Sequence, residues 1–137
     1  MRSLIRTDLE RKVASIVNEE RRKAGLPRLT TDPLLTEAAR AHSEDMAARG
    51  YFSHHSPEGT TAGHRVALTG YVFALVGENI AWGHENARQV MTAWMHSRGH
   101  KANILSPEYT QIGVGLAADR RGVLVWTQNF AVPGIDQ

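Results

Sequence analysis

The sequence predicts an α+β protein, a three-layer α-β-α sandwich in which helices pack on a central antiparallel sheet. Two stretches near the N-terminus and one after residue 86 repeat their apolar residues with helical spacing. The last third of the chain instead carries two β-rich stretches separated by a turn. With 137 residues, of which 42% are apolar, the chain is expected to form one domain over 1–137 that buries its own core.

The first predicted element is a helix from Thr7 to Ala24. Thr7 and Glu10 have the spacing of a capping box, and Gly25 supplies a stop because glycine adopts the left-handed conformation easily. The apolar side chains at helical spacing are Leu9, Val13, Ile16 and Val17. Residues 1–28 hold eight Lys and Arg residues, interleaved with four acids and without aromatic partners, which indicates a solvated helix face and no nucleic-acid partner.

A second helix is predicted to begin at Pro33 and to end at Gly50. Asp32 is a good N-cap, and proline suits the first helical position. The stripe on one side of this helix consists of Leu35, Ala38, Ala39, His42 and Met46. Because His42 lies on that stripe, we expect a packed histidine with one satisfied nitrogen and not a ligand.

An irregular segment follows over 50–64, where Pro, Gly and Ser residues are typical of a loop. It is also rich in groups that bind protons or metals. A short helix over His64–Leu68 and a strand over Tyr71–Val76 are expected next. Glu78 is expected just after the end of that strand.

A third long helix is predicted to begin after the N-cap Asn86. Gly99 is expected to break or bend it, and Lys101–Leu105 is expected to add one further turn. Strands over Tyr109–Leu116 and Val123–Phe130, joined by a glycine-containing turn, complete the predicted sheet.

The composition excludes several classes of chemistry. The chain has no cysteine, which excludes disulfides, thiolate zinc sites and a cysteine nucleophile. No window approaches the ~20 apolar residues of a membrane-spanning helix, so no transmembrane segment is expected. Seven histidines are present. A metal or acid–base site must therefore be built from histidine and carboxylate groups.

Two short motifs do not support a function. Residues 113–118 fit G-x-G-x-x-A, but a turn and a strand follow where a dinucleotide site needs a helix. Those glycines are expected to let the sheet bend or another backbone approach. His96 and His100 have the spacing of a zinc-protease helix, but Ser97 stands where that motif needs its glutamate.

A dispersed set of residues is the candidate metal site: His54, Glu78 and His100. Two neutral imidazoles and one carboxylate can hold a zinc ion with a fourth position open to water, and Glu78 is the candidate catalytic base. The alternative is structural, with both histidines hydrogen-bonded to Glu78 and no metal bound.

Several segments, in order, closely resemble the CAP superfamily of cysteine-rich secretory proteins, antigen 5 and pathogenesis-related 1 proteins, in its cysteine-free bacterial SCP-like branch. The matching segments are 51–59 (YFSHHSPEG), 77–81 (GENIA), 93–105 (AWMHSRGHKANIL), 112–115 (IGVG) and 126–130 (WTQNF). The resemblance implies an α-β-α sandwich and a cleft lined by two histidines, matching His54 and His100, and two acids. Glu78 matches the first acid, but Ser97 occupies the position of the second.

The resemblance also implies export, to the extracellular space or the cell envelope. Arg2, Arg6, Asp8 and Glu10 interrupt the N-terminus before any apolar leader can form, so the leader is expected to be absent from this chain. We expect a monomeric, non-catalytic binding module whose cleft takes a divalent metal such as zinc and a small molecule, peptide or lipid. The alternatives are a metal-dependent hydrolase of peptides or cell-wall material, and a lipid or sterol carrier lined by Tyr71–Val76.

Overall fold

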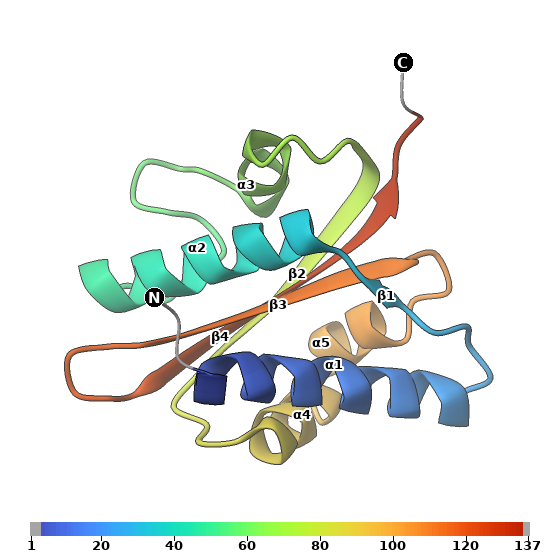
Figure 1. The fold of residues 1–137 in the computed structure, drawn as a ribbon, viewed down its shortest axis with the longest axis horizontal. Coiled ribbons are helices and arrows are strands. Elements are labelled where there is room, and N and C mark those ends of the chain that lie inside the picture. The colour runs from blue at the N-terminus through green and yellow to red at the C-terminus, as the bar shows by residue number, and fades with distance from the viewer. Residues whose placement is uncertain (1–3, 136–137) are drawn as a thin grey trace.

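The computed structural model describes residues 4–135, which form helices on both faces of one sheet (Figure 1). The elements in chain order are α1 (Leu4–Lys23), β1 (Thr30–Thr31), α2 (Pro33–Arg49), α3 (Ala62–Leu68), β2 (Phe73–Trp82), α4 (Ala87–Met95), α5 (Arg98–Ile104), β3 (Gln111–Ala118) and β4 (Leu124–Pro133). The predicted α+β sandwich is confirmed. Within the described residues no helix is both long and apolar enough to span a bilayer.

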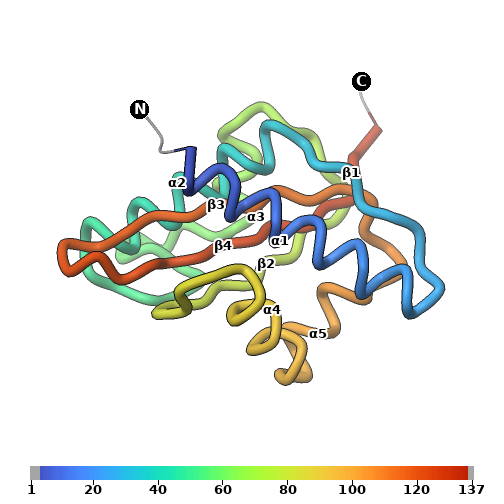
Figure 2. Tube along the Cα trace, turned by 60° about the horizontal axis from the view of Figure 1, so that its bottom comes forward, coloured from blue at the N-terminus to red at the C-terminus, as the bar shows by residue number. Residues whose placement is uncertain are grey.

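The strands lie in the order β1-β3-β4-β2. Strands β2, β4 and β3 pair antiparallel, as predicted. The two-residue strand β1, which the sequence did not predict, pairs parallel with β3 and makes the sheet mixed. In this order, strands β1 and β2 are the two edges of the sheet. The tube view shows α4 and α5 on the opposite side of the sheet from α3 (Figure 2).

Side chains alternate between the two faces of the central strands. Ile112 and Leu116 of β3 and Trp126 and Phe130 of β4 join one apolar core with α1, α4 and α5. On the other face, β3 carries Gly113 and Gly115, and an added Cβ at Gly115 would lie 2.1 Å from the Arg40 nitrogen of α2. The prediction that these glycines admit another backbone is confirmed, because α2 packs directly on them.

The predicted capping box of the first helix is wrong. Helix α1 begins at Leu4, so Thr7 lies inside it. The Glu10 carboxylate is instead buried, accepts the main-chain N–H of Leu116 at 3.0 Å and pairs with Arg40 at 2.7 Å. A tertiary partner has replaced the local one that the spacing indicated.

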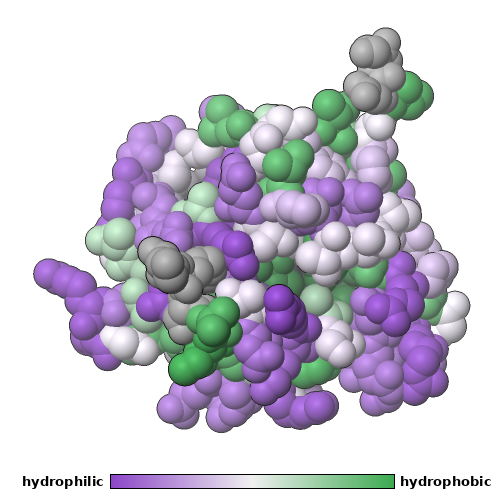
Figure 3. All heavy atoms as spheres, in the orientation of Figure 1, coloured by the Kyte–Doolittle hydropathy of each residue, from purple (hydrophilic) through white to green (hydrophobic). Residues whose placement is uncertain are grey.

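Two other boundaries differ from the predictions. Strand β2 continues to Trp82, so Glu78 lies within the strand and not after it. The break between α4 and α5 falls at residues 96–97, and Gly99 lies inside α5. The exposed face shown in Figure 3 is mostly hydrophilic, with hydrophobic side chains in separate groups.

Candidate functional site

Glu78 is the centre of the candidate site. Its side chain is 3% exposed and projects from the middle of β2. Oε1 lies 3.0 Å from His54 Nδ1, and Arg65 Nη2 donates to both carboxylate oxygens at 2.9 Å. Asn129 Nδ2 of the neighbouring strand donates to Oε2 at 2.9 Å. Each oxygen of this carboxylate therefore has two partners.

These partners determine the charge of Glu78. Burial by itself raises the pKa of the carboxyl, but the hydrogen bond from His54 and the charge of Arg65 oppose it, and the net effect lowers the pKa. Glu78 is thus an ionised carboxylate at neutral pH. Its charge is balanced by the Arg65 guanidinium of α3.

The loop that carries His54 is fixed from two sides. His42 of α2 places Nε2 2.8 Å from the carbonyl of Ser53. Arg65 donates to the carbonyls of His54 and Thr60 at 3.0 and 3.1 Å. The same arginine therefore binds the Glu78 carboxylate and orders the loop beside it.

His42 is 1% exposed, and its Nε2 lies 3.9 Å from Oε1 of Glu78. Burial lowers the pKa of this imidazole, more strongly than the Glu78 charge raises it, so His42 is neutral at neutral pH. Nδ1 has no hydrogen-bond partner among the described residues. The prediction of a packed histidine with one satisfied nitrogen is confirmed, although its place beside the carboxylate was not expected.

His100 lies on α5, and its main-chain carbonyl accepts a hydrogen bond from Asn79 at 3.0 Å. Asn79 neighbours Glu78 in β2 and points to the opposite face of the sheet. Burial and the charge of His54 lower the pKa of the half-buried His100 ring. Ser97, at the position of the second family acid, is the N-cap residue of α5 but makes no side-chain capping bond.

The structure thus joins His54 and Glu78 directly, and His100 of α5 lies near enough to His54 for the charge of that ring to lower its pKa. Within residues 4–135 no group of three or more His, Asp or Glu side chains is arranged to hold a metal ion. Neither Arg65 nor Asn129 was expected at the site. Only Asn129 had a signal, because it belongs to a run of three polar residues between Trp126 and Phe130 in an otherwise apolar strand.

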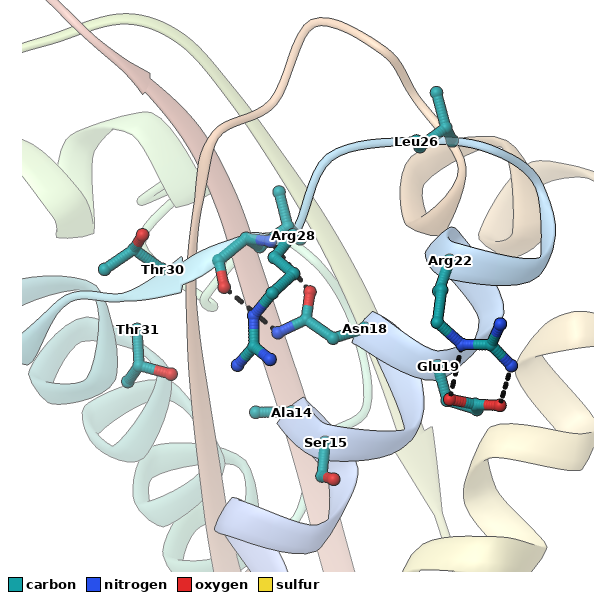
Figure 4. A pocket seen from close by; sticks show the side chains of 10 residues that line it. Ala14, Ser15, Asn18, Glu19, Arg22, Leu26, Arg28, Thr30 and Thr31 are labelled. Carbon is teal, nitrogen blue, oxygen red and sulfur yellow. Dashed lines mark hydrogen bonds and ion pairs between the residues drawn. The ribbon is translucent and has the colours of Figure 1, made fainter.

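A hollow of about 480 Å³ runs along β2 from Phe73 to Glu78. Its other walls are the loop at His54 and His55 and the start of α3 at residues 61–63. A second hollow of about 570 Å³ lies between α1 and β1, where Arg28 points inward (Figure 4). That second hollow holds none of the candidate residues, so the hollow along β2 is the candidate cleft.

Known proteins are similar to this chain in sequence and in fold. The family model described as CAP, the cysteine-rich secretory protein family, matches residues 14–130. The uncharacterized protein YkwD of Bacillus subtilis (strain 168) is 41% identical over 121 residues, which make up 88% of this chain and 46% of that protein. The chain therefore spans less than half the length of this relative.

Solved structures share the fold of this chain. An extracellular protein containing an SCP domain from Bacillus anthracis has a TM-score of 0.87 and 34% identity, over 93% of this chain and 41% of that chain. An outer surface protein from Borrelia burgdorferi has a TM-score of 0.86 and 23% identity, over 93% and 94% of the two chains. The more distant NaASP2, solved with Zn2+, shares the fold at a TM-score of 0.66 and 13% identity, over 91% and 85%.

Proposed function

The chain belongs to the cysteine-rich secretory protein (CAP) family, and from that premise we propose that it is an extracellular or cell-envelope, non-catalytic binding module. Its cleft would bind a divalent metal ion, such as zinc, at His54 and His100, with Glu78 as the supporting carboxylate. The relative that is an extracellular SCP-domain protein supports the location. The observation that carries the proposal is the fully paired carboxylate of Glu78.

That pairing argues against hydrolysis. A general base must reach the proton it removes and have a free lone pair to accept it. Both oxygens of Glu78 are occupied by His54, Arg65 and Asn129, and the guanidinium further lowers the basicity of the carboxylate. To act as a base, Glu78 would have to break a buried ion pair. A binding role leaves that ion pair intact.

The donors in the cleft fit a metal through imidazole nitrogens. With Nδ1 of His54 directed at the carboxylate, the proton belongs on Nδ1, which leaves the Nε2 lone pair free for a metal. A carboxylate that orients a metal-binding histidine is a common arrangement in proteins. His100 would supply the second nitrogen, since the lowered pKa keeps its ring neutral. Glu78 would orient His54 and would not itself bind the metal.

Calorimetric titration with zinc at pH 7.5 tests this assignment. We expect His54→Ala and His100→Ala each to weaken zinc binding by at least about tenfold, because each removes one of two protein ligands. Glu78→Gln should weaken it by about tenfold, the lower end of the usual effect of losing a supporting carboxylate. His96→Ala is the matched control, since His96 is exposed and bonds to Thr92 of its own helix. Equal binding by the wild type and the His54/His100 double variant would refute the metal site.

A further inference from the structure

The two edge strands of the sheet, β1 and β2, differ in how much of their main chain is open to another strand. An edge strand leaves main-chain N–H and C=O groups available to another chain. Beside β1, the amide of Asn18 accepts from the Leu29 N–H at 2.7 Å and donates to the Leu29 carbonyl at 3.0 Å (Figure 4). Of the two residues of β1, only Thr31 directs its main-chain groups away from β3, and the next residue, Asp32, already caps α2. This edge is too short to pair with a further strand.

At the other edge, the pairing with β4 determines which groups of β2 face outward. The Thr110 N–H donates to the carbonyl of Ala131, so Ala131 faces β3 and Phe130 faces β2. Gly77 lies opposite Phe130 and therefore bonds to β4, while Val76 and Glu78 on either side of it face outward. The Glu78 carbonyl accepts a hydrogen bond from Asn103 at 3.2 Å. In the same way, the carbonyl of Ile80 accepts from Trp94 Nε1 at 3.0 Å.

The hydrogen bonds from helix side chains to this edge reach the carbonyls of Ile80 and Glu78 and stop there. Val76 faces outward. Phe73 does so too, because its partner Pro133 has no N–H and Gly134 donates instead to the carbonyl of Val72. Among the described residues, no hydrogen bond to the outward main-chain groups of Val76 or Phe73 is found. The space beyond them is the cleft of about 480 Å³, whose wall is β2 from Phe73 to Glu78. The open part of the edge therefore faces the cleft directly.

We propose that the cleft binds an extended peptide that adds to β2 as an edge strand, with its C-terminal carboxylate next to His55. This inference rests on the proposed function, because it names the ligand class of the same cleft. Alternating N–H and C=O groups are matched by another extended main chain, which is the basis of peptide recognition by strand addition. The exposed apolar side chains of Val72 and Leu75 border this part of β2 and offer contacts for peptide side chains.

Charge determines the direction of the peptide. Among residues 4–135, Glu78 is the one acid that lines the cleft, and Arg65 neutralises it. His54 and His55 lie at the same end, so an anionic group is accommodated there and an amino terminus is not favoured. The bulge at Ala74 limits regular pairing to the few residues between Ala74 and Glu78. The expected ligand is thus a short, extended C-terminal segment.

The probe for this test is an acetylated hexapeptide of alternating valine and threonine with a free C-terminal carboxylate. In amide NMR spectra of the whole chain, we expect it to shift the Val76 signal and to slow the hydrogen exchange of that amide. The fully N-methylated peptide, which cannot pair as a strand, should not shift it. The C-terminally amidated peptide should bind about tenfold more weakly, because it loses a charge-assisted hydrogen bond from the exposed His55 ring.

Variants of Val76 test the same contact from the protein side. Val76→Pro removes the outward N–H, at an edge position where proline is tolerated, and should weaken peptide binding by about tenfold or more. Val76→Ala keeps the N–H and should bind within about threefold of the wild type. An unchanged Val76 signal, or equal binding of the N-methylated peptide, would overturn the inference even if Val76→Pro fails to fold.

Zinc titration of the same variants separates the two proposals. Val76→Pro is expected to bind zinc as the wild type does, because it changes neither His54 nor His100. Zinc binding without a peptide response at Val76 would overturn the strand-addition inference alone. A peptide response without zinc binding would overturn the metal site alone and leave strand addition supported.

Discussion

The two faces of the sheet are built by different means. The face under α1, α4 and α5 carries a continuous apolar core that includes Trp94, Trp126 and Phe130. The face under α2 and α3 has two small apolar clusters, one around Leu35 and one around Met46. Between those clusters lie buried polar residues: His42, Ser43, Glu78, Thr127 and Asn129. One face therefore supplies most of the apolar burial, and the other holds the candidate site.

This difference means that the site depends on satisfied polar contacts more than on apolar packing. A buried polar group is destabilising unless it is hydrogen-bonded. The Ser43 hydroxyl donates to the carbonyl of Gly115 at 3.0 Å and lies 2.8 Å from the hydroxyl of Thr127. Close packing of α2 on the β3 glycines makes those short contacts possible. The four substitutions that follow test how differently the two faces respond.

The largest effect is expected on the apolar face, from Trp126→Ala. Trp126 is 0% exposed, and its Nε1 donates to the carbonyl of His84 at 2.9 Å. Its removal leaves a cavity and an unpaired carbonyl, so the free energy of unfolding should fall by about 3–5 kcal/mol. Urea denaturation measures this loss. Trp82, which is 49% exposed, is the matched control: a Trp82→Ala loss of the same size would contradict the assignment of stability to this core.

On the polar face, Glu78→Ala is expected to lower the free energy of unfolding by about 3 kcal/mol. It leaves the Arg65 guanidinium buried without its carboxylate, and breaking a buried pair from one side is strongly destabilising. The double variant Glu78→Met/Arg65→Met should recover part of that loss, because it removes the unpaired charge as well.

The control for that experiment is an exposed ion pair. Arg22 and Glu19 of α1 lie only 2.6 Å apart, yet both side chains are largely exposed. Pairs of this kind contribute little to stability because water screens them. Glu19→Ala should leave the urea midpoint essentially unchanged. A midpoint shift as large as that of Glu78→Ala would show that burial does not distinguish the two pairs.

Gly115→Ala tests the contact between α2 and β3 that underlies the polar face. The new Cβ would lie 2.1 Å from Arg40 N and 2.3 Å from Ala39 C, both in the main chain of α2. The helix must move away, and we expect a loss of about 1–3 kcal/mol in thermal or urea unfolding. Gly99→Ala is the control, because a Cβ there meets nothing within 4 Å. It should stabilise the chain slightly, so destabilisation by both variants would argue against overpacking as the cause.

The same difference between faces explains what the sequence could and could not predict. Local signals predicted α2 correctly, since Asp32 caps it and Gly50 ends it in the left-handed conformation. Local signals did not place Glu78 correctly. Nothing in the sequence near this carboxylate shows that the buried Arg65, 13 residues earlier, will neutralise it inside a strand. The family resemblance marked His54 and Glu78, which the structure joins. Arg65 and the beginning of β1 depend on tertiary contacts that local periodicity does not contain.

The smallest expected effect is the response of stability to acid. Burial lowers the folded-state pKa of His42, and burial with the His54 charge lowers that of His100, so the unfolded chain binds these protons more readily. Their contribution to stability is complete above the unfolded histidine pKa of about 6.5 and is lost as pH falls below it. The pKa of Glu78 is also lowered, so its contribution is lost only at lower pH, below about 4.3. Melting temperatures at pH 7.5, 6 and 5 should therefore decline in the histidine range first.

His42→Gln keeps a donor for the carbonyl of Ser53 but cannot be protonated, and should reduce that decline, whereas the exposed His96→Gln should not. A decline of equal slope in the wild type and His42→Gln would show that the buried histidine of the polar face does not make the fold acid-sensitive.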